Sequence, residues 1–181
     1  MERILALVHT EPDGSLSKAA RESVGSARTL AAALNGSELV AGLVGGELGR
    51  AANELADCGA TRFFGVSGVD FAESRYATDA AAAEAISREA GAGLVVAPGT
   101  SRWSRALPGV THRLGGQVDP HVTAIRAEDG AVSATRWYYR QRMQATVQRT
   151  QRPWVLLVDP GCQAPWAGES GAASLEAVLV D

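Results

Sequence analysis

The first half of the chain alternates between short apolar runs and longer segments with helical spacing. The apolar runs are typical of strands buried on both faces, and the segments between them repeat apolar residues every three or four positions. The runs are ILALVH (4–9), ELVAGLVG (38–45), RFFGV (62–66) and GLVVAPG (93–99), and the helical segments are 18–34, 48–59 and 77–90. Such alternation predicts crossover connections and a parallel sheet with helices on both faces.

The second half of the chain has a different pattern. Residues 121–127 and 131–139 read as strands on either side of Asp129-Gly130, and Asp-Gly is a strong hairpin signal. MQATVQ (143–148) alternates apolar and polar residues, as a half-exposed strand does, whereas WVLLV (154–158) is apolar throughout and fits the sheet interior. From His121 onward we therefore expect antiparallel pairing to extend the sheet. Residues 104–114 are expected to form a short helix.

These patterns together predict an α/β fold with three layers, α/β/α. The sheet is expected to be mostly parallel and to be extended by antiparallel strands and a hairpin. A chain of 181 residues is long enough for one domain with a sizeable core, which we assign to residues 1–158. Residues 159–181 are rich in Gly, Ala, Ser and Pro, so we interpret them as a linker or tail with a weak apolar patch at 175–180.

Charge and composition exclude several classes of function. A net charge of -3 argues against general nucleic-acid binding, which needs a basic surface to displace counterions. The two cysteines and three histidines fit no metal-ligand spacing, and no histidine stands in a recognisable relation to a nucleophile and an acid. No apolar stretch approaches the ~20 residues of a membrane span, and the apolar run at the N-terminus is too short for a signal peptide. We predict a cytoplasmic protein that is not an enzyme.

Positive charge is concentrated in one stretch of this net negative chain. Residues 135–158 contain no Asp or Glu and five arginines: Arg136, Arg140, Arg142, Arg149 and Arg152. Any function of this charge must be local. It could contact a protein partner, form a solvated face without a function, or contact an anion or nucleotide.

A second candidate region is APGTSRWSR (97–105), which follows a predicted strand and opens a helix. Thr100 or Ser101 could cap that helix or bind an anion at its N-terminus, and Arg102 would add positive charge there. Thr100, Ser101 and Arg102 are therefore the candidate cofactor-binding residues. The competing interpretation is a capped loop without a ligand.

This stretch resembles the N-terminal domain of the alpha subunit of electron transfer flavoproteins. That family has a strand followed by A-P-x-T-T, a helix with a central proline, and a segment ending in D-V-T. Further on it has R-P-x-Y-A-G-N-A-x-A-T-V, which RWYYRQRMQATV resembles. The matching positions are Ala97, Pro98, Thr100, Ser101, Pro108, Val122, Thr123, Arg136, Tyr139, Ala145, Thr146 and Val147. With the opening strand and its turn at Gly14 and Leu16, the similarity covers roughly residues 3–158.

The chain also departs from the family pattern. Gln141-Arg142 replaces Gly-Asn, Gly109 replaces the arginine after the helix proline, and His121 replaces the aspartate of D-V-T. The sequence contains no counterpart of the C-terminal domain that holds FAD in family alpha subunits. We therefore expect that the chain does not hold FAD alone and that a purified preparation of it is colourless.

The resemblance implies an adenine-nucleotide-hydrolase-like α/β fold and a role as the scaffold half of an electron-transferring complex. It implies a heterodimer with a beta-type subunit, in which AMP is possible, and a flavin dehydrogenase as the electron donor to the FAD of the complex. The arginine-rich strands fall where the family's domain meets its partner, so Arg136, Tyr139, Arg140 and Arg142 are the predicted partner interface. The alternative is a universal-stress-like domain that binds AMP or ATP at the strand ends, although the phosphate loop of that class is not found.

Overall fold

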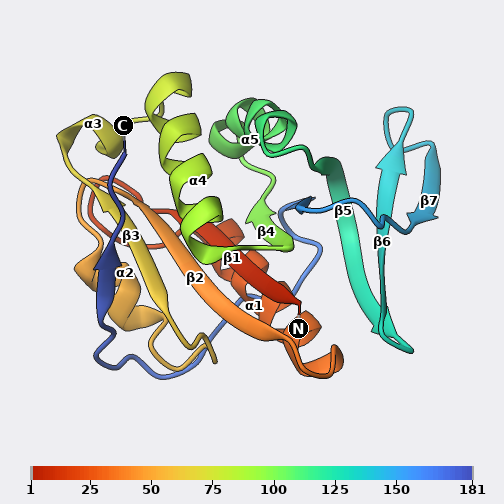
Figure 1. Ribbon diagram of the computed structural model, residues 1–181, viewed down its shortest axis with the longest axis horizontal. Helices are drawn as coiled ribbons and strands as arrows, with labels where there is room; N and C mark the ends of the chain where they lie inside the picture. The colour runs from red at the N-terminus through yellow and green to blue at the C-terminus, as the bar shows by residue number, and fades with distance from the viewer. Residues whose placement is uncertain (1, 181) are drawn as a thin grey trace.

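The computed structural model describes residues 2–180, which form a single sheet covered by helices on both faces (Figure 1). The strands are β1 (Arg3–His9), β2 (Glu38–Gly45), β3 (Phe63–Ser67), β4 (Leu94–Pro98), β5 (Gln117–Glu128), β6 (Ala131–Tyr138), β7 (Met143–Val147), β8 (Trp154–Val158) and β9 (Leu175–Ala177). The helices are α1 (Lys18–Ala33), α2 (Gly49–Glu54), α3 (Val69–Ala72), α4 (Tyr76–Ala90) and α5 (Ser101–Arg113).

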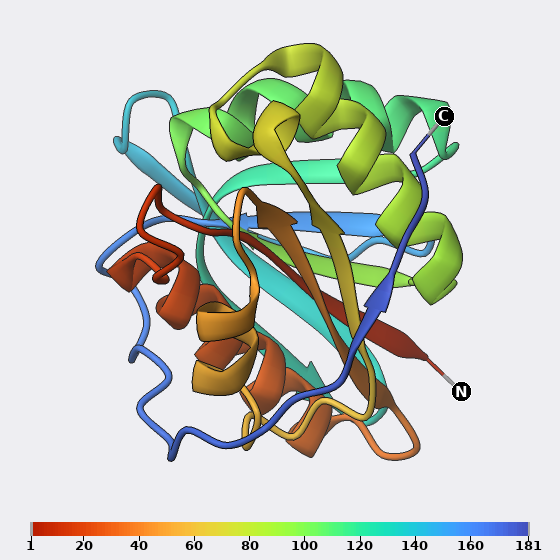
Figure 2. The same ribbon diagram turned by 90° about the vertical axis from the view of Figure 1, so that its left-hand side faces the viewer.

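Within residues 2–180, nine strands lie in the order β7-β6-β5-β8-β4-β1-β2-β3-β9. β1 pairs in parallel with β2 and β4, and β2 pairs in parallel with β3, which confirms the expected parallel core. The side chains of β1 alternate: Ile4, Ala6 and Val8 pack with α1 and α2, while Leu5 and Leu7 pack with α4 and α5. Figure 2 shows the two helical layers on opposite sides of the sheet. The predicted α/β class with its mixed sheet is therefore confirmed.

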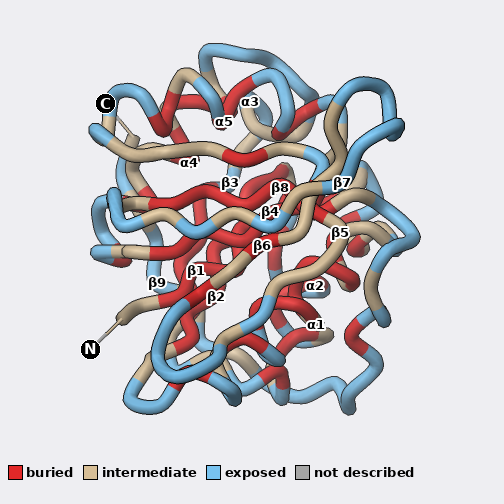
Figure 3. Tube along the Cα trace, turned by 90° about the vertical axis from the view of Figure 1, so that its right-hand side faces the viewer, coloured by how far each residue is buried: buried red, intermediate tan, exposed pale blue. Residues whose placement is uncertain are grey.

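Among the named strands of residues 2–180, antiparallel pairing is confined to β5, β6 and β7, which corrects the expectation that it holds for everything after His121. β8 inserts between β4 and β5 and runs parallel to both. All five residues of β8 are buried, so this strand needs a helix-covered position on both faces, and only the interior of the sheet offers one. β6 and β7 lie at the edge, where intermediate and exposed residues predominate (Figure 3).

Two helices differ in length from the sequence-based expectation. The segment 48–59 was expected to be helical throughout, but α2 ends at Glu54 and the chain continues in turns. α5 begins at Ser101 rather than at Ser104, because the Thr100 hydroxyl accepts a hydrogen bond from the backbone N–H of Trp103 and so caps the earlier turn.

The described part of the tail, residues 159–180, lies along α1 and α2 before it reaches the sheet edge. Trp166 is buried; its backbone N–H donates to the carbonyl of Arg21 at 2.8 Å and its indole N–H donates to the carbonyl of Glu54 at 3.3 Å. Further on, β9 pairs in parallel with β3, and Arg62 and Glu176 form an ion pair across this pairing. The domain boundary at residue 158 stays a prediction.

The close fit of the tail on α1 provides a test. A Cβ added at Gly25 would lie 2.5 Å from the carbonyl oxygen of Ala164. Gly25→Ala should therefore lift the tail from α1 and raise its rate of limited proteolysis roughly tenfold, although alanine itself favours a helix. Gly49→Ala is the matched control, because a Cβ on this α2 residue meets nothing within 4 Å. Equal cleavage of both variants would show that the tail does not depend on this contact.

Candidate functional site

Three of the five arginines in residues 135–158 pair with acids elsewhere in the chain. Arg136 and Arg149 both bind Asp119, which lies on β5, and Arg152 binds Glu2. The positive charge of this stretch is thus partly compensated, by two carboxylates, through tertiary contacts that the linear sequence does not show.

Asp119 is fully buried and accepts hydrogen bonds from three side chains. Arg136 Nη1 lies 2.6 Å from Oδ1, Arg149 Nε lies 3.0 Å from Oδ2, and the indole N–H of Trp154 donates to Oδ2 at 2.8 Å. Burial alone would raise the pKa of Asp119, but the hydrogen bonds from Arg149, Trp154 and Arg136 outweigh it, and the pKa lies below its ordinary value. Because one carboxylate faces two guanidinium groups, a positive charge remains at this edge of the sheet.

The turn between β6 and β7, which we call the arginine turn (residues 139–142), has an unusual backbone. Tyr139, Arg140 and Gln141 have φ values of 50°, 54° and 63°, and none of them is Gly, Asn or Asp. A side chain in this left-handed region costs about 1 kcal/mol or more per residue, and such strain is often found at functional sites. The strain marks the turn as a candidate site.

The side chains of the arginine turn point to solvent. Tyr139 is 73% exposed, and Met143, the first residue of β7, is 62% exposed. Arg140 and Arg142 are exposed, and within residues 2–180 no carboxylate lies within ion-pair distance of either. The Arg142 guanidinium lies 6.0 Å from the centre of the Tyr139 ring. Arginine and aromatic side chains of this kind are enriched at protein interfaces.

A cavity of about 610 Å³ adjoins the arginine turn. Its lining comprises His121, Arg136, Trp137, Tyr138, Tyr139, Arg140 and Gln141. His121 has a φ of 60° within an irregular stretch of β5, and its Nδ1 lies 3.3 Å from Asp159 Oδ1. The cavity is thus bounded by cationic, aromatic and amide groups.

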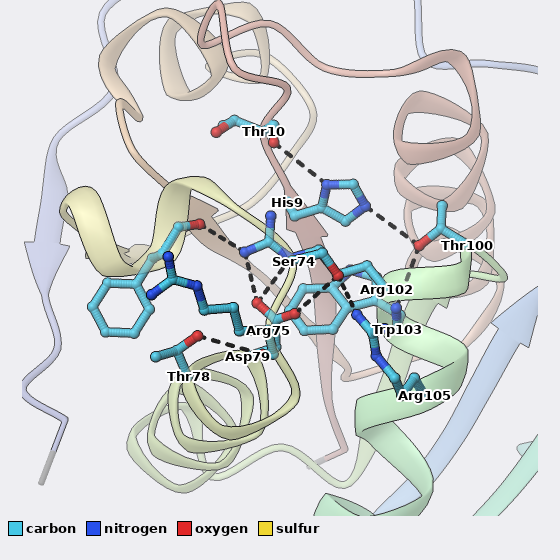
Figure 4. A network of polar contacts seen from close by, with 11 residues as sticks. His9, Thr10, Ser74, Arg75, Thr78, Asp79, Thr100, Arg102, Trp103 and Arg105 are labelled. Carbon is cyan, nitrogen blue, oxygen red and sulfur yellow. Dashed lines mark hydrogen bonds and ion pairs between the residues drawn. The ribbon is translucent and has the colours of Figure 1, made fainter.

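The second candidate region lies at the carboxyl ends of β1 and β4, and Figure 4 shows its contacts. Thr100 caps α5, and its hydroxyl lies 3.3 Å from His9 Nε2. Ser101 is exposed. The Arg102 side chain is only 6% exposed; it binds Asp79 Oδ1 with Nη2 at 2.6 Å and donates to the carbonyl of Phe71. Thr100 and Arg102 are therefore already engaged by groups of the protein itself.

His9 belongs to the same network. Burial lowers its pKa below the ordinary value, and the nearby positive charge of Arg102 lowers it further. The ring meets Trp103 edge to face, with centroids 5.8 Å apart. His9 thus packs on Trp103 and contacts the Thr100 hydroxyl, so its side chain is engaged within the protein.

Sequence reasoning missed the two acids that organise these regions, Asp119 and Asp79. Both are fully buried, and each neutralises arginines that come from other elements. The available signal was weak. Asp119 precedes the strand expected at 121–127 and lies on β5 only in the structure, and Asp79 lies in the first turn of a helix, where acids are common because they interact favourably with the helix dipole.

The described part of the chain holds neither a metal-ion cluster nor a helix that could span a membrane. Over residues 2–180, no group of three or more His, Cys, Asp or Glu side chains is placed to hold a metal ion. Within the same residues, no helix has the length and apolar character needed to cross a membrane.

The fold is that of an α/β domain, and the arginine turn gives it an exposed surface with cationic and aromatic side chains. The family model described as the electron transfer flavoprotein domain matches residues 4–181, so the chain belongs to this family. The family consists of electron carriers rather than catalysts. No curated protein sequence matches the chain significantly.

Proposed function

We propose that this chain is the alpha-type, scaffold-forming half of an electron transfer flavoprotein complex and that it forms a heterodimer with a beta-type subunit. Support comes from the order of the alpha-type positions. Pro98 ends β4, Thr100 caps α5, Pro108 lies inside α5, and Val122 and Thr123 lie on β5, as in the motif series of that subunit. In this proposal a flavin dehydrogenase in the cytoplasm supplies the electrons.

The arginine turn is the observation that carries this proposal. It combines two arginines without a carboxylate partner in the described chain, an exposed tyrosine, an exposed methionine and a strained backbone. The positive φ values close the β6–β7 hairpin, but here they are adopted by Tyr, Arg and Gln rather than by Gly or Asn. Exposed aromatic and arginine side chains on such a turn fit a contact surface for a partner. An acidic side chain on the partner would compensate the charge of Arg142, and Arg140 would lie beside this contact. Arg136 serves the interface indirectly, since its guanidinium is bound to Asp119.

The complex would contain FAD, and we propose that residues outside this chain hold it. Open α/β sheets bind nucleotide cofactors at the carboxyl ends of their strands. Here Thr100 binds the α5 backbone and His9, and Arg102 binds Asp79 and Phe71. These side chains do not fit a flavin nucleotide, because a ligand would have to displace partners that are already well placed. The same contacts give no support to AMP or ATP binding at this edge.

Arg142→Ala tests the proposal in the co-expressed heterodimer. We expect the variant to weaken the dimer by about 2 kcal/mol, since a carboxylate of the partner would be left unpaired at the interface. The melting temperature of the isolated chain should stay nearly unchanged, because Arg142 makes no ion pair within residues 2–180. Affinity should be measured by titration at low and at high salt.

Arg126→Ala is the matched control, since Arg126 is an exposed arginine of β5 that lies outside the arginine turn. It should leave the dimer affinity unchanged. If wild type, Arg142→Ala and the Arg140/Arg142 double alanine variant bind the beta-type subunit equally well, the arginine turn is a solvated surface and the proposal is wrong.

A further inference from the structure

The cavity beside the arginine turn has the composition of a ligand site. Its volume of about 610 Å³ lies within the usual range of small-molecule pockets and exceeds what one side chain of a protein partner would fill. Three neighbouring aromatic residues, Trp137, Tyr138 and Tyr139, line it. The Arg136 guanidinium already lies 4.1 Å from the centre of the Tyr138 ring, so Trp137 and Tyr139 are the rings available to a ligand.

The electrostatics of the cavity favour an anion. Arg136 and Arg140 both line it, and within the described residues, 2–180, the lining includes no carboxylate. Asp119 binds Arg136 and Arg149 together, so one negative charge is shared between two positive charges. Asp159 lies behind His121, at 3.3 Å from its Nδ1, and is not part of the lining. The guanidinium of Arg140 has no carboxylate within ion-pair distance in residues 2–180 and is the group best able to bind an anionic oxygen.

We infer that this cavity binds a small planar aromatic molecule that carries a phosphate group. Its ring would stack on Trp137 or Tyr139, and Arg140 would donate forked hydrogen bonds to the phosphate oxygens. The strained backbone of the arginine turn supports this assignment, because it places Tyr139 and Arg140 beside the same cavity. This site is separate from the carboxyl ends of β1 and β4, where the side chains are engaged with one another.

AMP is a suitable probe, since it joins an aromatic ring to a phosphate, and adenosine and inorganic phosphate test each half alone. Isothermal titration of the isolated chain should give a Kd for AMP below about 1 mM. Adenosine and inorganic phosphate should each bind at least tenfold more weakly than AMP. The affinity should fall with salt, as expected for an ionic contact near the surface. Quenching of tryptophan fluorescence by AMP should disappear in Trp137→Phe while binding persists, because the other tryptophans are buried.

Two arginine variants separate this inference from the proposed interface. Arg140→Ala should weaken AMP binding roughly tenfold, the loss of a charge-assisted contact. Arg142→Ala should leave AMP binding unchanged, because Arg142 belongs to the arginine turn but does not line the cavity. The inference is overturned if AMP at several millimolar gives no binding signal, or if Arg140→Ala binds AMP as tightly as wild type. Equal affinity for AMP and inorganic phosphate would also overturn it. If the wild-type chain does not bind AMP and Arg140→Ala weakens the heterodimer, the cavity belongs to the protein interface alone.

Discussion

Asp119→Asn is expected to lower the free energy of unfolding by about 3–5 kcal/mol, because it removes a buried charge that two guanidinium groups share. Asn has nearly the same size as Asp, so the loss is one of charge and hydrogen bonding rather than of volume. Arg136, whose side chain is 13% exposed, would be left in the interior without its counter-ion. Equilibrium unfolding in urea, read as a shift in midpoint at constant slope, measures the effect.

Asp129→Asn is the matched control for this substitution. Asp129 is exposed in the hairpin between β5 and β6, and its φ of 51° is one that Asn also tolerates. We expect a change of less than about 0.5 kcal/mol. If both substitutions changed stability equally, the contacts of Asp119 with arginine would contribute nothing measurable.

Asp119 also predicts how stability depends on pH. Its pKa in the folded protein is lower than in the unfolded chain, so the unfolded chain binds more protons when the pH falls through the acidic range. The contribution of Asp119 is fully present above its unfolded pKa of about 3.9 and is lost as the pH falls towards the lower folded value. Asp119→Asn should remove that part of the acid sensitivity.

Asp119 also bears on the proposed function, because its hydrogen bonds link three strands. Arg136 lies on β6, Trp154 lies on β8 and Asp119 itself lies on β5. The carboxylate thus ties the hairpin that carries the arginine turn to the interior of the sheet. In Asp119→Asn we therefore expect weaker partner binding as a secondary result of a displaced turn.

Arg102→Ala is also expected to destabilise the chain by about 3–5 kcal/mol, because here a buried carboxylate rather than a guanidinium loses its partner. It leaves Asp79, which is fully buried, without its cationic partner, and it removes the hydrogen bond to the carbonyl of Phe71. Arg102 joins α5 to α4 and to the end of α3, so these helices should open locally more easily in the variant. The thermal unfolding transition should therefore also become less cooperative.

Two further variants identify the cause of this loss. Arg50→Ala breaks an ion pair with Asp13 in which both side chains are 64% exposed, and it should change stability by less than about 1 kcal/mol. The double variant Arg102→Met/Asp79→Leu should recover most of the loss, since apolar residues of similar volume can replace a buried ion pair. A double variant as unstable as Arg102→Ala would show that the cost came from packing rather than from the unpaired charge.

The sequence by itself determined most of the parallel core. Buried strands such as 4–9 and 38–45 are recognisable because they are apolar throughout, and the helices between them repeat at 3.6 residues, so both signals are local. The hairpin at Asp129-Gly130 was equally clear, since its turn chemistry lies within two residues. The motif order around Thr100 and Arg136 indicated the family, which the match over residues 4–181 confirms.

The tertiary structure alone decided where β8 and the tail lie, and which arginines have no ion pair within residues 2–180. The place of β8 between β4 and β5 depends on burial on both of its faces, and an apolar run does not specify its neighbours. The five arginines look alike in the sequence, because the acids that neutralise Arg136, Arg149 and Arg152 lie up to 150 positions away. Charge compensation depends on distance in space rather than on spacing along the chain. For that reason only the folded chain distinguishes Arg140 and Arg142, which are exposed on the arginine turn, from arginines that hold the sheet together.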